Sequence, residues 1–133
     1  MASESDDELT GPSRRFVSWL VAIVVVGAAV RLGYVWLDRR HAEMVFNDGF
    51  YYHHGANLLA DGRGFINPFE WQFQGRSLPS ADHPPLYLVY LAAFSAVGLR
   101  SVEAHLLASV VFGVAAVAVA GLLGRRVASE RVG

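Results

Sequence analysis

Apolar residues gather in three long runs, at residues 16–37, 85–100 and 102–124. The first and third exceed the roughly 20 residues that a helix needs to cross a hydrocarbon core about 30 Å thick. The second is shorter, so its helix would have to tilt, extend past its ends or be shielded by neighbours. The third carries small residues at helical spacing, which let another helix approach closely. The pattern predicts an all-α integral membrane protein with about three transmembrane helices.

The segments outside these runs are polar. Residues 1–15 contain four acids and few apolar side chains, which predicts a disordered cytoplasmic tail. Residues 38–84 form a long loop, in which an Asn-Asp pair and a closing Gly predict a helix at about 49–61. Its aromatic, half-apolar composition is typical of an amphipathic juxtamembrane helix. The end, residues 125–133, predicts a connection to a further helix, so we expect the chain to be truncated.

Arginine placement predicts the orientation. Arg14 and Arg15 flank the first run, whereas residues 38–84 hold six acids against four Arg. The positive-inside tendency therefore places the amino terminus in the cytoplasm and the loop outside. Three spans would leave the arginines of residues 125–133 outside as well, so either residues 85–100 insert only partly or a fourth helix follows. A cleaved signal peptide is the alternative for the first run, but two further apolar runs follow it.

Composition narrows the class of protein. The chain is 53% hydrophobic and 17% charged, which favours a lipid-embedded protein. A formal charge of −1 gives no basic surface for nucleic acid. There is no Cys, which excludes disulfides and thiolate chemistry. All basic residues are Arg, and with the abundant Ala, Val and Gly this suggests a GC-rich bacterial genome. Together with the apolar runs, this predicts a multi-pass protein of the bacterial inner (plasma) membrane.

Two places in the loop carry candidate chemistry. Asp48 is either the amino-terminal cap of the predicted helix or a catalytic carboxylate, and the local pattern favours neither. Asp82 and His83 precede the second apolar run, where they could hold a divalent metal or contact an anion. The alternative is a helix cap beside a solvated His. His53 and His54 are better explained as interfacial residues than as ligands.

Arg31 lies inside the first apolar run. A charge at the centre of a membrane helix costs about 2.5 to 3.5 kcal/mol on insertion scales. Arg31 is close enough to the end of the run to snorkel outward, or it serves as a cation facing a helix bundle and an anionic lipid headgroup.

The motifs together resemble the GT-C superfamily of membrane glycosyltransferases, in particular the protein O-mannosyltransferase and aminoarabinose transferase branch (glycosyltransferase family 39 type). The resemblance covers most of the chain in order and spacing. It is carried by Arg-Leu-Gly-Tyr at 31–34, Asp-Gly-Phe-Tyr-Tyr at 48–52, the Gly-rich stretch at 55–64, His-Pro-Pro-Leu-Tyr at 83–87 and Gly-Arg-Arg at 124–126.

The resemblance implies transfer of a sugar from polyprenyl phosphate to an acceptor hydroxyl at the outer membrane face. Asp48 occupies the position of the catalytic base, and Asp82 and His83 correspond to residues that contact a metal or the lipid-linked phosphate. Further substrate-binding candidates are Arg31, Tyr51, Tyr52, Arg63 and Arg76. The expected partners are the lipid-linked donor, membrane lipid and other membrane helices that complete the fold.

Family members are much longer, so we expect only their amino-terminal portion here, inactive alone. Two other interpretations stay open. One is a non-enzymatic scaffold or accessory subunit that keeps the fold without the chemistry. The other is a transporter fragment, for which Arg31 is the one intramembrane charge in the sequence.

Overall fold

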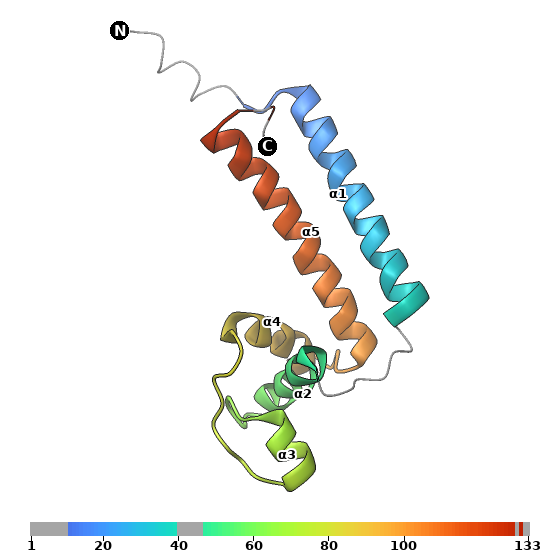
Figure 1. Cartoon of the computed structure of the whole chain (residues 1–133). Helices are drawn as coiled ribbons and strands as arrows, with labels where there is room; N and C mark the ends of the chain where they lie inside the picture. Colours follow the sequence, from blue (N-terminus) through green and yellow to red (C-terminus); the bar gives the residue numbers. More distant parts are fainter. Residues whose placement is uncertain (1–10, 40–46, 130, 132–133) are drawn as a thin grey trace, which may run out of the picture. The chain divides into compact units, whose positions relative to one another are not determined.

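The computed structural model describes residues 11–39, 47–129 and 131, and these are helical apart from loops and one isolated antiparallel bridge between Ile66 and Pro79. The helices in chain order are α1 (Arg14–Tyr34), its π-helical continuation η1 (Val35–Arg39), α2 (Asp48–Ala60), α3 (Pro68–Gln74), α4 (Pro85–Ala96) and α5 (Val102–Val127) (Figure 1). The predicted all-α fold is confirmed. The elements divide into two compact units, one of residues up to Leu32 and from Val110 onward, the other of Gly33–Ser109.

Unit 1 contains α1 up to Leu32 and the part of α5 from Val110, which run antiparallel (Figure 1). Near the start of α1, the Phe16 ring centre lies 5.8 Å from the guanidinium carbon of Arg125. Near the end of α1, the Arg31 side chain lies so close to Gly113 that a Cβ there would be 2.8 Å from its Nε. The small residue at position 113 therefore makes room for the arginine.

Both long helices are apolar and poorly covered. Arg14–Asp38, at 25 residues, and Val102–Val127, at 26, are long and apolar enough to cross a membrane. Several of their apolar side chains are more than half exposed: Val21, Val25, Val26, Val30 and Val111. Burial of such surface is what stabilises a protein in water. The exposed surface favours lipid, or further helices, as the surroundings of this unit.

The predicted span at residues 85–100 is not confirmed. The helix there, α4, has 12 residues. At about 1.5 Å per residue it reaches roughly 18 Å, well short of a 30 Å core. It packs instead against α2 in unit 2. The described residues thus contain two helices, rather than three, that could span a membrane.

Unit 2 is built on the contact between α2 and α4. Gly55 faces Leu88, and a Cβ at position 55 would lie 2.8 Å from a Leu88 methyl, so glycine lets the two helices approach closely. The buried core consists of small and branched residues from α2, α4 and the first part of α5: Ala56, Leu91, Ala92 and Ala108. This packing fixes the start of α2 beside the start of α4.

The helix α3 was not predicted, although its signals are in the sequence. Asn67 caps it by accepting hydrogen bonds from the backbone N–H groups of Phe69 and Glu70. Pro68 occupies the first helical position, and Gly75 ends the helix with φ of 66°. These are ordinary start and stop residues. The helix is only 7 residues long, too short for a periodic apolar pattern to stand out.

Candidate functional site

Asp48 and His83, 35 residues apart in sequence, meet in unit 2. Asp48 is the first residue of α2, and His83 lies just before Pro84 and α4. His83 Nε2 is 3.2 Å from Asp48 Oδ1. Because an ionised carboxylate only accepts hydrogen bonds, His83 donates from Nε2. The Asp48 side chain is 86% exposed, so its carboxylate is held by the imidazole and remains accessible.

The structure gives the helix cap to a different residue. Asn47 has extended backbone angles, and its side-chain oxygen accepts a hydrogen bond from the Phe50 N–H at 3.1 Å. This is the usual geometry of an amino-terminal cap. The cap of α2 is therefore Asn47, and Asp48 is the acid of its first turn, where the helix dipole favours a negative charge.

Two tyrosines hold the His83 ring. Tyr51 stacks on it at 3.9 Å between ring centres, and Tyr52 meets it edge-on at 5.3 Å. Tyr51 is itself buried, and its hydroxyl is 2.8 Å from Ser80 Oγ. Desolvation, followed by the negative charge of Asp48, raises the pKa of Tyr52. Tyr52 therefore keeps its proton in the neighbourhood of the Asp48 carboxylate. Both tyrosines named from the sequence thus contact His83, and their role in substrate binding stays a prediction.

Asp82 faces other partners than His83. Its Oδ2 accepts hydrogen bonds from Ser80 Oγ at 2.8 Å and from Asn67 Nδ2 at 3.4 Å. The carboxylate therefore ties the loop before α4 to the cap of α3. The hydrogen-bond partner of His83 is therefore Asp48 and not Asp82. The metal site at Asp82 and His83 stays a prediction.

Metal ligands are few in this geometry. Among the described residues no three His, Cys, Asp or Glu side chains lie close enough together to hold a metal ion. His83 Nδ1 is buried and has no hydrogen-bond partner in the described part of the chain. Asp48 and His83 supply one oxygen and one nitrogen, a ligand set that a divalent cation could use only with oxygens from substrate and water.

Each arginine named from the sequence has contacts of its own. Arg76 makes an ion pair with Glu70, its Nη2 lying 2.7 Å from Oε2. Arg63 places its guanidinium 4.1 Å from the centre of the Trp71 ring. Both are thereby anchored to α3. Arg31 belongs to unit 1, where its Nη1 donates to the Gly27 carbonyl oxygen at 3.2 Å.

A buried polar chain in unit 2 was missed at the level of sequence. His53 Nδ1 lies 3.0 Å from His105 Nδ1, and His105 Nε2 lies 2.9 Å from Ser95 Oγ. Ser95 Oγ donates to Asn57 Oδ1 at 2.8 Å. Three of these side chains are buried: His53, Ser95 and His105. These hydrogen bonds connect α2, α4 and α5, and they stabilise the packing that places Asp48 beside His83.

The donors and acceptors of this chain can be assigned. Ser95 has one hydroxyl proton, which goes to Asn57, so its oxygen accepts from His105 Nε2–H. In a neutral His105 ring the other nitrogen, Nδ1, is then an acceptor. His53 must therefore carry its proton on Nδ1. All hydrogen bonds in the chain point from His53 toward Asn57.

His53 gives the fold a pH dependence. Burial, and then the neighbouring His105 and His54, lower the pKa of His53 from 6.5 to about 4. The unfolded chain binds this proton below about pH 6.5, whereas the folded chain does not until about pH 4. Stability is therefore full above pH 6.5 and is lost as the pH falls toward 4. We expect a loss of about 1 to 2 kcal/mol by pH 5, allowing for partial screening by solvent.

Thermal unfolding in detergent between pH 8 and pH 5 measures this loss. His53→Gln should remove much of the pH dependence. His54→Gln removes an adjacent imidazole whose pKa burial also lowers, but by less than that of His53, so it should remove a smaller part of the pH dependence. A wild-type midpoint that does not fall on acidification would show that the buried imidazoles do not control stability.

Comparison of the chain with protein-family models, with curated proteins and with solved structures gives no match.

Proposed function

We propose that the chain is the amino-terminal part of a glycosyltransferase that moves a sugar from polyprenyl phosphate to an acceptor hydroxyl at the outer face of a bacterial inner membrane. The observation that carries the proposal is the exposed Asp48 carboxylate, oriented at 3.2 Å by the Nε2–H of His83. A fixed, accessible carboxylate at the end of a helix is suited to accept a proton from a bound hydroxyl. The sequence resemblance supports the same assignment.

In this reaction the acceptor oxygen forms a bond to the anomeric carbon as the bond from that carbon to the phosphate oxygen breaks. Asp48 accepts the hydroxyl proton at the oxygen that His83 does not hold. Tyr51 and Tyr52 position the imidazole. Because Tyr51 is buried, only the half-buried Tyr52 ring offers aromatic surface to the donor. Polyprenyl phosphate leaves with the electron pair of the broken bond.

The leaving phosphate needs positive charge near it. Arg63 suits this task better than Arg76, because the charge of Arg76 is already neutralised by Glu70. A divalent ion, if one takes part, would have to replace the hydrogen bond between His83 and Asp48, because Nε2 cannot donate that proton and bind the ion at once. It would then be held by these two side chains with phosphate oxygens and water, and would supply charge neutralisation. Arg31, in unit 1, is proposed to meet an anionic lipid headgroup.

We propose a two-span topology, with α1 and α5 crossing the membrane and residues 38–101 between them outside. Because α1 and α5 are antiparallel, this topology brings Arg14 and Arg15 and the arginines of residues 125–131 to the cytoplasmic side together, as the positive-inside tendency favours. The three-span interpretation separated these two groups of arginines.

Single cysteines test the topology, since the chain has none of its own. Ser77→Cys should react with an impermeant thiol reagent in intact cells. Ser129→Cys, beyond the end of α5, should react only after the cells are opened. Labelling of Ser77→Cys only in opened cells would reverse the orientation and remove the basis for an outer-face enzyme. Labelling of both positions in intact cells would restore the third span.

The transfer reaction itself is tested with the purified chain, alone and together with the product encoded immediately downstream. The mixture receives a defined polyprenyl-phosphate sugar, and the release of polyprenyl phosphate is followed. We expect turnover in the combined sample. Absence of turnover with every donor and acceptor offered, while the two chains still form a complex, would favour a non-enzymatic accessory subunit. The exposed apolar faces of α1 and α5, which suit contact with other helices, are the observation in favour of that second candidate.

A further inference from the structure

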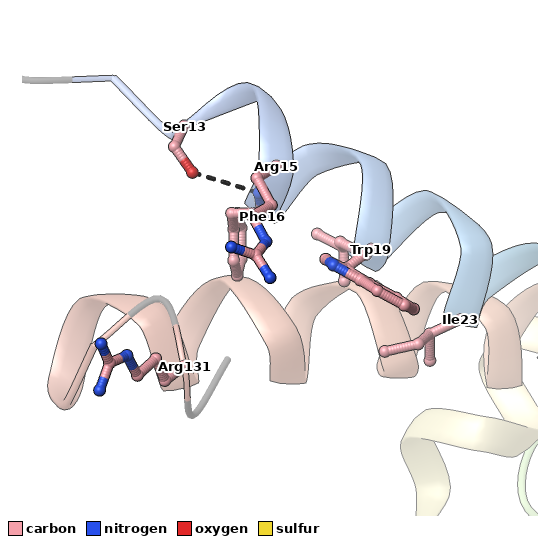
Figure 2. Close-up of a pocket in the computed structure, with 7 residues that line it drawn as sticks. Ser13, Arg15, Phe16, Trp19, Ile23 and Arg131 are labelled. Atoms are coloured by element: carbon pink, nitrogen blue, oxygen red, sulfur yellow. Dashed lines mark hydrogen bonds between the residues drawn. The ribbon is translucent and has the colours of Figure 1, made fainter.

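Unit 1 contains a pocket at the end where α1 begins and α5 finishes. It has a volume of about 710 Å³, within the size range of small-molecule sites. Figure 2 shows Arg15, Phe16, Trp19 and Ile23 extending from α1 along the pocket, with Arg131 beyond the end of α5. Phe16, which lines the pocket, is buried. The backbone N–H of Phe16 donates a hydrogen bond to Ser13 Oγ at 3.2 Å.

The two ends of the pocket differ in chemistry. Arg15 and Arg131 are the charged residues among those that line it. Deeper along α1 lie Trp19 and Ile23, which are 63% and 51% exposed. A guanidinium binds phosphate oxygens in a two-pronged geometry, and Trp prefers the boundary between headgroups and acyl chains. The charged and the apolar residues of the pocket match the headgroup and the acyl chain of one phospholipid molecule.

We propose that this pocket binds the phosphate headgroup and adjoining acyl chain of an anionic phospholipid. Arg15 and Arg131 contact the headgroup oxygens, and Trp19 and Ile23 line the path of the chain. The pocket belongs to unit 1 and the Asp48–His83 pair to unit 2. The proposal therefore requires a membrane but does not rest on the proposed transferase function.

Native mass spectrometry of the detergent-purified chain, titrated with phosphatidylglycerol or phosphatidylcholine, tests the site. The chain should retain phosphatidylglycerol several-fold more tightly than phosphatidylcholine. Arg15→Gln should weaken phosphatidylglycerol binding about fivefold, the contribution of one arginine near an anionic lipid surface. Trp19→Ala should weaken binding of both lipids, since it removes the apolar wall that they share. Far-UV circular dichroism of each variant checks that the helices are retained.

Arg14→Gln is the matched control. It removes the same charge one residue away, at a position that does not line the pocket. It should change phosphatidylglycerol affinity by less than about twofold. Equal losses in Arg14→Gln and Arg15→Gln would mean diffuse attraction to the arginine cluster and would overturn the site. The proposal would also be overturned by equal affinity for the two lipids, or by a lipid-free dimer that protects Trp19 from quenchers.

Discussion

Asp48→Asn is expected to reduce sugar transfer by about 10² to 10⁴, the range found when a general base is lost. Asn has nearly the same shape, and its side-chain oxygen can still accept the Nε2–H of His83, so the geometry of the pair is kept. What it cannot do at neutral pH is accept a proton from the sugar acceptor. Turnover in the reconstituted transfer assay, at saturating donor, measures the effect.

Asp61→Asn is the matched control for this substitution. Asp61 lies at the other end of α2 and makes a half-exposed ion pair with Arg100 at 2.7 Å. Exposed pairs of this kind contribute about 0 to 1 kcal/mol to stability, so transfer should be unchanged. Because Asn47 caps α2, thermal stability should stay near that of wild type in both variants. Near-normal transfer by Asp48→Asn would move the base to Asp82 or outside this chain.

Ser95→Ala should destabilise unit 2 by about 2 to 3 kcal/mol. Ser95 is fully buried, and its hydroxyl joins His105 to Asn57. Alanine leaves the His105 Nε2–H and the Asn57 side-chain oxygen without this partner. A buried polar group left unsatisfied costs about 1 to 3 kcal/mol. The thermal unfolding midpoint of the detergent-solubilised chain should fall accordingly.

Ser18→Ala serves as the comparison for the serine variant. Its hydroxyl donates to the Arg14 carbonyl oxygen on an exposed part of α1, so its loss should change stability by less than about 0.5 kcal/mol. If Ser95→Ala were no less stable than Ser18→Ala, the buried chain of polar groups would not be holding α2, α4 and α5 together.

The helices were largely predictable because their signals are local. Long apolar runs predicted α1 and α5, and the Asn-Asp start with the closing Gly62 predicted α2 to within a residue at each end. The third span was not confirmed because apolar content alone does not say what covers a helix. One face of α4 is buried against α2, while Leu86 and Val89 on another remain exposed. The close approach at Gly55 that permits this packing is a tertiary property.

The site was predictable as a set of residues but not as an arrangement. Asp48 and His83 were both named from the sequence, yet their pairing depends on how α2 packs on α4. Asp82, the sequence neighbour of His83, takes Ser80 and Asn67 as partners instead. The two residues of the His53–His105 contact are 52 positions apart in sequence. Nothing in the sequence around His105, a single His in the apolar run of α5, indicates which residue it contacts.

The central claim is that the Asp48–His83 face receives a lipid-linked sugar. Photocrosslinking tests it most directly, with a polyprenyl-phosphate sugar that carries a photoreactive group on the sugar and with the adducts mapped by peptide mass spectrometry. The account predicts adducts within residues 48–52 and 80–87, competed by the unmodified donor. Adducts confined to α1 and α5, or adducts that excess donor does not reduce, would contradict it.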